Sequence, residues 1–281
     1  MKFIVHIKMF ALITNRTNEE IKLNFKGTLM SAKLIYITPL WLIVNGIRYS
    51  HDNHHLSDTK EKQQAYITKT VIKGDFVNEK IKEHIIGNKD FDLIKRVGFK
   101  MKHESVLEHS LIIFEIEASR ALLQELSRHR IGVSPTVKST RYVLKKDLKN
   151  EKSFEWNTLE EFKEIKDRAK KYVYLTGYDD IDDRIIRALE ELRWLIKENF
   201  PNDIIKYALP EAFLFKGQYS FNLRSLVHLL ELRTNKDVLP EFQRLCVDII
   251  DALPDDYKEL VLTNEKIRTN YKRIKNDCKS N

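Results

Sequence analysis

The stretch Arg128–Tyr142 reads Arg-His-Arg-Ile-Gly-Val-Ser-Pro-Thr-Val-Lys-Ser-Thr-Arg-Tyr, and most of its side chains carry positive charge or can donate a hydrogen bond. It follows an apolar pattern of helical period, and Gly132 and Pro135 indicate an irregular backbone. Arginine pairs with phosphate through two parallel hydrogen bonds, and the hydroxyl groups of Ser, Thr and Tyr add orientation. The stretch therefore predicts a site for phosphate or a similar anion.

A purely structural interpretation of Arg128 and Arg130 is also open. Basic residues in the last turn of a helix complement the helix dipole and are common there for that reason alone. The two arginines are two residues apart, so on a regular helix they would point to different faces and reach different groups. The ordered hydroxyl and cationic residues of Ser139–Tyr142, immediately downstream, favour the anion site.

Three ordered motifs of the chain resemble those of the flavin-dependent thymidylate synthases. The first is Arg128-His129-Arg130 followed after eight residues by Ser139, where the family usually has a spacing of seven. Upstream, His103–His109 resembles the family's His-Glu-x-x-x-Glu-His segment. Downstream, Asn222–Leu226 with Leu232-Arg233 resembles its Asn-x-Arg-Ser-Leu…Leu-Arg helix. The resemblance spans about residues 33 to 250.

The resemblance implies an α/β fold in a single domain, with a central, mostly antiparallel sheet flanked by helices. The eight glycines include no Gly-x-Gly-x-x-Gly run, which agrees with a flavin site that is not of the Rossmann type. We expect an N-terminal extension at residues 1–30, the synthase domain at 31–262 and a charged C-terminal tail at 263–281.

The activity that the resemblance implies is the conversion of dUMP to dTMP. Methylenetetrahydrofolate would supply the carbon, FAD would carry the hydride and NADPH would be the reductant, in a cytoplasmic homotetramer with active sites between subunits. Because the flavin carries the difficult chemistry, the protein mainly positions and polarises its substrates. Many arginine and hydroxyl contacts and few acid–base pairs are then expected, as the motifs contain.

The resemblance also assigns roles to single residues. Arg233 would be catalytic: it would hydrogen-bond the uracil ring and stabilise the negative charge that develops there. Ser139 and Arg141 would hold the dUMP phosphate across a subunit interface. The residues expected at dUMP are Arg128, Glu125, Ser139, Thr140, Arg141, Lys206 and Arg233. The residues expected at FAD are Ser50, His103, Ser105, Arg128, His129, Arg130, Asn222, Arg224 and His228.

Several residues depart from the family pattern. Val137 stands where family members often have glutamate, and Asp237 stands where a flavin-contacting histidine is expected. Glu125 replaces a glutamine and His228 an asparagine, while Lys206 replaces an arginine and so offers a point charge in place of a planar fork. These departures leave open a homologue that keeps the fold and oligomer but has lost turnover.

The charge balance suits an anionic partner, because the net charge is +8 and the pI is near 9.2. A nucleic-acid-binding protein that uses Arg128–Arg141 as a basic loop is therefore a further alternative. It would need contiguous basic surface with interleaved aromatic residues, and only Tyr142 offers such a residue in this stretch. We predict small-molecule partners and neither nucleic acid nor membrane.

Because the chain has only two cysteines, we expect no disulfide framework, and a reducing cytoplasm fits this composition. Cys246 lies in an apolar helical pattern and Cys278 in a polar segment, so neither is placed as an activated nucleophile. Their placement agrees with the flavin route, since the unrelated thymidylate synthases attack the pyrimidine with a cysteine. The apolar runs Phe10–Ile13 and Leu40–Val44 are too short to span a bilayer.

The hydrophobic periodicity predicts three strands, at Lys33–Ile37, Leu111–Ala118 and Ala212–Phe221. Helices are expected after Pro39, in Phe76–Arg96, Arg120–Arg128, residues 158–175 and 180–199, after Pro201, and in Leu223–Arg233 and Val238–Leu253. Ser119 and Asn222 are predicted N-caps. Tyr142–Trp156 is predicted to be a charged connector, and the chain after Tyr257 a helix that frays into a mobile tail.

The run His51–His55 raises the question of a metal site. Adjacent histidines in a loop lack the spacing that regular elements give to metal ligands, and no cysteine accompanies them. We therefore predict a solvated or lid-like loop and no metal.

Overall fold

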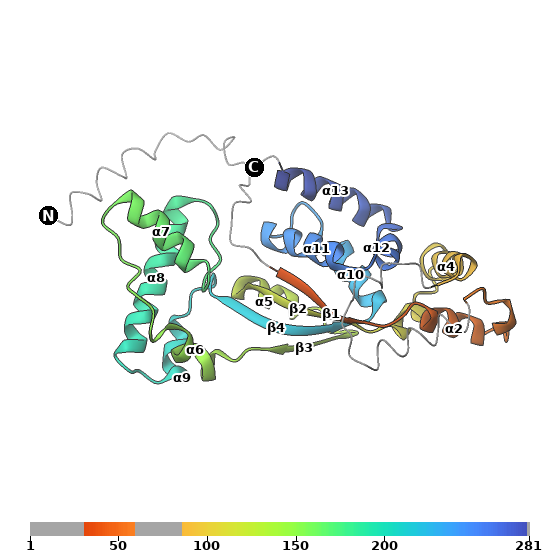
Figure 1. Cartoon of the computed structure of the whole chain (residues 1–281), viewed down its shortest axis with the longest axis horizontal. Helices are drawn as coiled ribbons and strands as arrows, with labels where there is room; N and C mark the ends of the chain where they lie inside the picture. The colour runs from red at the N-terminus through yellow and green to blue at the C-terminus, as the bar shows by residue number, and fades with distance from the viewer. Residues whose placement is uncertain (1–30, 60–85, 280–281) are drawn as a thin grey trace.

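A four-stranded antiparallel sheet lies at the centre of the computed structural model, which describes residues 31–59 and 86–279 (Figure 1). The strand order is β1-β2-β4-β3, so β1 and β3 are the edge strands. The strands are β1 (Ser31–Ile37), β2 (Ile112–Ser119), β3 (Val133–Val137) and β4 (Leu214–Phe221). This sheet confirms the predicted α/β fold class, and all of its pairings are antiparallel.

The side chains of β2 alternate between a buried and a half-buried face, as the sequence predicts. Ile112, Phe114, Ile116 and Ala118 are fully buried, while the residues between them are half-buried. Alternation of β-branched and aromatic residues with polar ones fits a strand with one face in the core. The predicted strands Lys33–Ile37 and Ala212–Phe221 also form, as β1 and β4.

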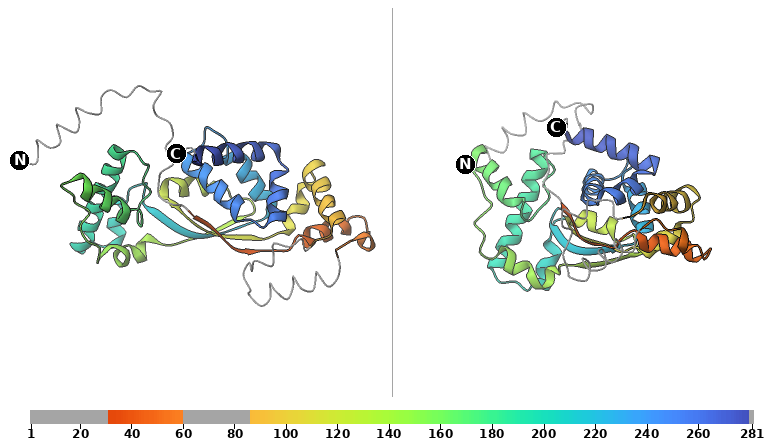
Figure 2. Two further views of the ribbon diagram at one scale, coloured as in Figure 1. Left: turned by 45° about the horizontal axis from the view of Figure 1, so that its top comes forward. Right: turned by 45° about the vertical axis from the view of Figure 1, so that its right-hand side comes forward.

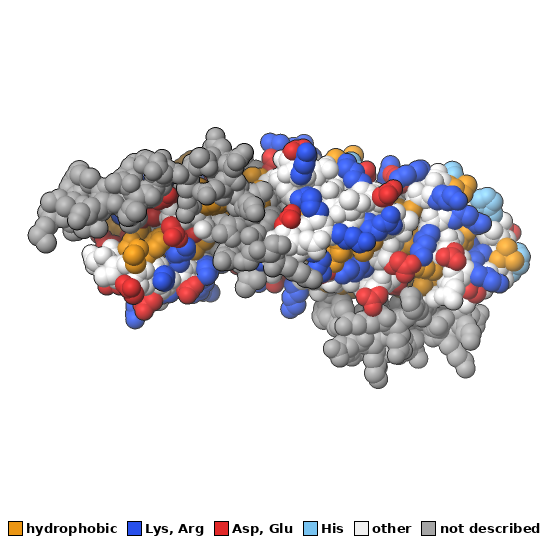
Figure 3. Space-filling model, turned by 90° about the horizontal axis from the view of Figure 1, so that it is seen from above, with side chains coloured by type: hydrophobic (Ala, Val, Ile, Leu, Met, Phe, Trp, Pro, Cys, Tyr) orange, Lys and Arg blue, Asp and Glu red, His pale blue; other side chains and the backbone are white. Residues whose placement is uncertain are grey.

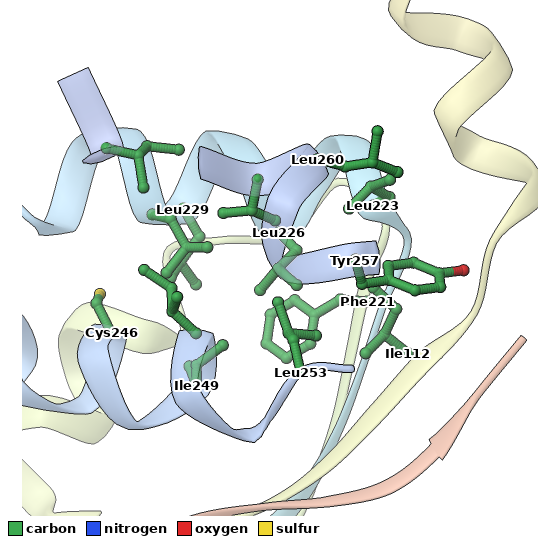
Figure 4. Close-up of a cluster of buried hydrophobic side chains, with 14 of the residues drawn as sticks. Ile112, Phe221, Leu223, Leu226, Leu229, Cys246, Ile249, Leu253, Tyr257 and Leu260 are labelled. Carbon is green, nitrogen blue, oxygen red and sulfur yellow. The ribbon is translucent and has the colours of Figure 1, made fainter. Parts of the chain in front are cut away.

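One face of the sheet is covered by the C-terminal helices (Figures 1 and 2). Figure 4 shows strand residues Ile112 and Phe221 in one hydrophobic cluster, called the main core below, with helix residues Leu226 and Ile249 and with Leu253, which follows a helix. The helices are α10 (Leu223–Arg233), α11 (Pro240–Ala252), α12 (Asp255–Leu262) and α13 (Glu265–Lys279).

The C-terminal segment differs from the expected frayed tail. Ile267, Tyr271 and Ile274 recur at helical spacing along α13 and are buried against the main core. Burial of this stripe orders a helix that is otherwise strongly charged, because packing of an apolar face stabilises helices more than intrinsic propensity does.

A second set of helices, residues 140–208, follows β3 and precedes β4 in the sequence. It lies at one end of the sheet and is called the helical lobe below (Figures 1 and 2). It has a hydrophobic core of its own, which includes Phe154, Ile165 and Leu189. Its elements are α6 (Thr140–Leu148), α7 (Leu159–Ala169), α8 (Asp179–Lys197), α9 (Asn202–Ile205) and the 3₁₀-helix η5 (Lys206–Ala208).

The connector predicted at Tyr142–Trp156 is wrong for its first part, because α6 occupies residues 140–148. Leu144 and Leu148 are one turn apart and buried in the core of the helical lobe. Two apolar residues among many charged ones are a weak periodic signal, and tertiary packing decides the structure here.

At the other end of the sheet, short helices bring distant segments together. They are α2 (Trp41–Tyr49), η1 (His54–Leu56), α4 (Asn88–Ile94), the π-helix η3 (Lys95–Lys100) and the 3₁₀-helix η4 (Glu104–His109). Helix α5 (Arg120–Leu126) begins at the opposite end of β2, where the Arg120 amide donates to the Phe213 carbonyl. Buried Arg48 donates through Nε to Asp90 at 3.1 Å, which joins α2 to α4. The 3₁₀-helix η4 packs against both α2 and α10.

The predicted helix after Ser119 forms as α5 but ends at Leu126, before the Arg128 motif. The predicted extension at residues 1–30 and the first part of the helix expected at Phe76–Arg96 lie outside the described residues. Among the described helices, none combines the length and the hydropathy needed to cross a membrane.

Candidate functional site

Arg233, the last residue of α10, forms hydrogen bonds with the end of α5 and the residues that follow it. Its Nε donates to Nε2 of His129 at 3.0 Å, and its Nη1 donates to a carboxylate oxygen of Glu125 at 2.8 Å. Its Nη2 donates to the Glu125 carbonyl at 3.4 Å. Arginine has five N–H groups, so these three contacts leave one hydrogen on each terminal nitrogen to donate elsewhere.

Two neighbours fix this guanidinium further. The fully buried Phe242 of α11 lies beneath it, 5.0 Å from its central carbon to the ring centroid. Glu125 also pairs with Arg128, at 3.3 Å. The Arg233 side chain is 18 % exposed and the Arg128 side chain 71 %. The two cations thus share one carboxylate, and Arg128 is the one that extends into solvent.

His129 is held in its neutral form. Its Nε2 accepts the Arg233 hydrogen bond, which assigns the remaining proton to Nδ1. Burial, together with the positive charges of Arg233 and the nearby His228, lowers the pKa of His129 from its ordinary value to about 4. The ring is therefore an acceptor and not a charged group at neutral pH.

Arg224 and His228 lie one turn apart on α10 and extend the cluster toward η4. Arg224 pairs with Glu108 at 2.6 Å and with Glu104 at 3.5 Å. The rings of His228 and His129 have centroids 6.4 Å apart, so α10 connects the Arg233 cluster to the η4 residues.

Beside these α10 residues is a small hollow of about 70 Å³. Its lining combines the apolar Phe99, Leu107 and Val227 with the charged groups of Lys102 and Arg224. Ligand pockets commonly have volumes of roughly 300–1,000 Å³, so this hollow alone does not enclose a dinucleotide.

The turn between α5 and β3 is fitted tightly against α10. Gly132 has a φ of +66°, and a Cβ there would lie 2.2 Å from Oγ of Ser225 and 2.4 Å from Nδ2 of Asn222. Ser225 donates to the Ile131 carbonyl at 2.7 Å. The pairing of β3 with β4 is regular from Val133 onward, so irregular backbone is confined to the turn before the strand.

The predicted phosphate ligands lie on the helical lobe and not beside Arg233. Ser139 is the N-cap residue of α6 and is exposed, and Thr140 begins that helix. Arg141 pairs with Asp203 through Nε at 2.6 Å. Lys206 is exposed, with Nζ 5.9 Å from the Tyr207 ring centroid. Strand β3 separates these residues from Arg128 and Arg130: at about 3.3 Å per residue, the strand alone spans roughly 13 Å.

The remaining residues expected at FAD lie on or next to α2, η4, α10 and the turn after α5. Ser50 follows α2 and donates to the Ile47 carbonyl at 2.7 Å. His103 is the N-cap residue of η4, and both it and Ser105 are exposed. Asn222 caps α10 by accepting from the Ser225 amide at 2.8 Å, which confirms the predicted N-cap. Arg130 is exposed in the turn after α5.

Sequence reasoning did not assign roles to the partners that hold these arginines. Glu104 and Glu108 both contact Arg224 from the 3₁₀-helix η4, and they lie within the His103–His109 motif, which is a signal that the sequence offers. Phe242 beneath Arg233 and Asp203 beside Arg141 had no such signal, because each meets its arginine only through tertiary packing.

The structure also shows where two of the departures from the family pattern and the histidine run lie. Val137 is half-buried in β3 opposite Gly217, and Asp237 is exposed between α10 and α11. His54 and His55 lie in η1. Within residues 31–59 and 86–279, no group of three or more His, Cys, Asp or Glu side chains is arranged to hold a metal ion.

Comparison with known proteins gives consistent results. The family model described as thymidylate synthase complementing protein matches residues 34–255. A flavin-dependent thymidylate synthase of Campylobacter jejuni is 42% identical over 173 residues, which cover 61% of this chain and 79% of that protein. One of Helicobacter pylori is 44% identical over 180 residues, which cover 62% and 82%.

A crystal structure of thymidylate synthase X from Helicobacter pylori with FAD and dUMP has a similar fold. Its TM-score is 0.70 at 34% identity, over 85% of this chain and 100% of that chain. A UMP/dUMP methylase from Streptomyces cacaoi, at 15% identity and a TM-score of 0.53 over 85% and 96% of the two chains, shares the fold.

Proposed function

The chain belongs to the thymidylate synthase complementing protein family, and from this premise we propose that it is a flavin-dependent thymidylate synthase that converts dUMP to dTMP. The observation that carries the proposal is the preorganised guanidinium of Arg233. It is held by Glu125, His129 and Phe242 with two N–H groups left to donate. The relatives that carry this activity in their names are more than 40% identical to the matched segment.

In this proposal Arg233 binds the uracil ring of dUMP. A carbonyl oxygen of the ring accepts the free N–H groups, and the fixed cation stabilises negative charge that builds up on the ring during the reaction. Because Glu125, His129 and Phe242 hold the guanidinium before the substrate arrives, no reorganisation is needed when the charge develops. Neutral His129 assists by accepting from Arg233 without adding a second positive charge.

FAD would bind along α10 and the ends of α5 and η4. The donors there fit a dinucleotide: exposed Arg128, Arg130 and Arg224 can pair with its phosphates, and exposed His103, Ser105 and His228 offer further hydrogen-bonding groups. When bound, the flavin supplies the hydride chemistry. The solved relative with FAD and dUMP supports the same cofactor and substrate for this chain.

The dUMP phosphate would be held by Ser139, Thr140, Arg141 and Lys206 of a second subunit. These residues lie on the helical lobe, beyond the far end of β3 from the turn that carries Arg130. A single nucleotide cannot span both groups within one chain if β3 keeps them apart. A site shared between two chains, with the helical lobe of one beside Arg233 and Arg128 of the other, would bring the two groups together, and we propose a homotetramer.

The co-substrates complete the proposed reaction. Methylenetetrahydrofolate is the carbon donor and NADPH the reductant, both inferred from the family resemblance of the three motifs. The same resemblance is the basis for proposing a cytoplasmic location.

The test is dTMP formation from dUMP, methylenetetrahydrofolate and NADPH, with and without added FAD. We expect FAD-dependent product, and a loss of kcat/KM of about 10²–10³-fold in Arg233→Ala, the range seen when a preorganised charge donor is removed. Lys236→Ala is the matched control, because it removes an exposed positive charge three residues away. No product from a folded protein saturated with FAD would contradict the proposal and would favour a homologue that has lost turnover.

A further inference from the structure

The connection between α10 and α11, residues 234–239, begins immediately after Arg233 and is buried at its start. Thr234 is fully buried and closes α10 by donating its hydroxyl to the Leu230 carbonyl at 2.8 Å. The last carbonyls of a helix have no partner within the helix and need donors from elsewhere. The way these carbonyls are satisfied therefore fixes the backbone that carries Arg233.

Arg273 of α13 supplies one of those donors. Its Nη2 donates to the Thr234 carbonyl at 2.8 Å and to Oε1 of Gln243 at 2.9 Å. A cation at the C-terminus of a helix also interacts favourably with the helix dipole. Asn270, one turn earlier on α13, donates to the Thr234 hydroxyl at 3.5 Å.

Gln243 completes the attachment from α11. It is 2 % exposed, and its Nε2 donates to the Val238 carbonyl at 2.6 Å and the Lys236 carbonyl at 3.3 Å. Its neighbour Phe242 lies under the Arg233 guanidinium. One pair of adjacent residues on α11 therefore touches both the Arg233 side chain and the connection that Arg273 holds.

From these contacts we propose that Arg273 is a positioning residue: through Thr234 and Gln243 it sets the place of Arg233, and so the affinity for dUMP. Arg273 lies in α13, beyond residue 255 where the family-model match ends. Its side chain is 34 % exposed and contacts the connection and Asp277, not the Arg233 guanidinium. The inference rests on the proposed function, in which Arg233 binds the uracil ring.

The experiment is a double-mutant cycle read as dUMP affinity by calorimetry on the FAD-loaded protein. Arg273→Ala should raise the dUMP dissociation constant about three- to tenfold, within the range that remote residues contribute to coupling. In the Arg233→Ala background the same substitution should cause little further change, because it acts through Arg233. Arg273→Lys keeps one donor and the charge, and should recover part of the affinity.

Lys272→Ala is the matched control, since Lys272 is the exposed neighbour of Arg273 on α13. Its dUMP affinity should equal that of the wild type. An equal loss of affinity from Arg273→Ala in both backgrounds, or a similar loss in Lys272→Ala, would overturn the positioning role and indicate a general effect of α13 on stability.

The outcomes separate this inference from the proposed function. If Arg233→Ala leaves dUMP binding unchanged, the proposed role of Arg233 fails. If Arg233→Ala weakens binding and Arg273→Ala does not, only the positioning role of Arg273 fails.

Discussion

The contacts of Arg233 explain how a positive charge can be both fixed and available. Three of its N–H groups are used by Glu125 and His129, and its flat face lies on Phe242. A guanidinium is suited to this because its donors lie in one plane and its faces stack on aromatic rings. The side chain is 18 % exposed, so the guanidinium is mostly buried but still accessible to a ligand.

The low pKa of His129 makes the stability of the protein depend on pH in a definite direction. The folded pKa is about 4 and the ordinary value 6.5, so between these values the unfolded chain binds more protons than the folded one. The free energy of unfolding therefore falls as pH falls from about 6.5 to 4. Above pH 6.5 the ring is neutral in both the folded and the unfolded chain, so His129 makes no pH-dependent contribution there. Because the ring is partly exposed, the slope should be less than the one-proton limit of about 1.4 kcal/mol per pH unit.

His129→Gln tests this, since glutamine keeps an acceptor for Arg233 but does not titrate. Thermal unfolding of both proteins from pH 7.5 to 4.5 should show the wild type losing stability more steeply than the variant below pH 6.5. Parallel curves would mean that His129 does not stay neutral in the folded protein.

For single residues, the sequence predicts which side chains belong to the candidate site better than it predicts which side chains they contact. The motif residues Arg128, His129 and Arg233 were singled out, and the structure brings His129 and Arg233 into contact. Their assigned roles toward dUMP and FAD stay predictions. The dependence on Phe242 and Arg273 could not be predicted, because these contacts arise from tertiary packing that leaves no local pattern in the chain.

Among the elements, α10 does the most to assemble the candidate site. Its first residues lie against the Gly132 turn, its middle carries Arg224 and His228, and its end carries Arg233. The helix and its Asn222 cap were predicted because a capping residue precedes a clear apolar stripe. By contrast α6 has few apolar residues among many charges, so its helix was missed.

Asn222 has two separable roles, a cap for α10 and a predicted contact to FAD. Asn222→Ala should destabilise the protein by about 1 kcal/mol, the usual cost of losing an N-cap, measured as a lower Tm. Asn222→Asp keeps the accepting oxygen and should retain the Tm, yet bind FAD more weakly because it loses the amide donor and adds negative charge. Unchanged FAD affinity in Asn222→Asp would remove Asn222 from the flavin site and leave it a structural cap.

For the whole molecule, the important arrangement is that the two groups of predicted dUMP residues lie on different parts of one chain. Arg233 ends α10, while Ser139 and Arg141 lie at the start of α6 on the helical lobe. Figure 1 shows these two helices in different parts of the molecule. The fold class followed from the resemblance and from strand alternation. The sequence did not predict that β3 separates the helical lobe from Arg233, because this separation depends on where an extended strand lies in three dimensions.

Figure 3 shows Lys and Arg intermingled with Asp and Glu on the face seen from above, which does not favour a nucleic-acid partner.

A shared site makes a prediction about mixtures of inactive variants. Arg233→Ala and Arg141→Ala should each lose most activity, yet a co-refolded or co-expressed mixture should recover on the order of a quarter of the wild-type sites, those that receive an intact half from each variant. Steady-state rates of the two variants and of their mixture measure this. A mixture no more active than its components would contradict a site formed between subunits.

The two separate hydrophobic cores have a consequence for hydrogen exchange. The core of the helical lobe and the core between the sheet and the C-terminal helices have no residue in common among those described. Backbone amides in α8 and in β2 should therefore exchange as two cooperative units with different opening free energies. A nucleotide that bridges the lobe of one subunit and α10 of another would slow exchange in both units together. Protection that arises in the two units at the same ligand concentration would then report occupancy of the complete site, without any measurement of turnover.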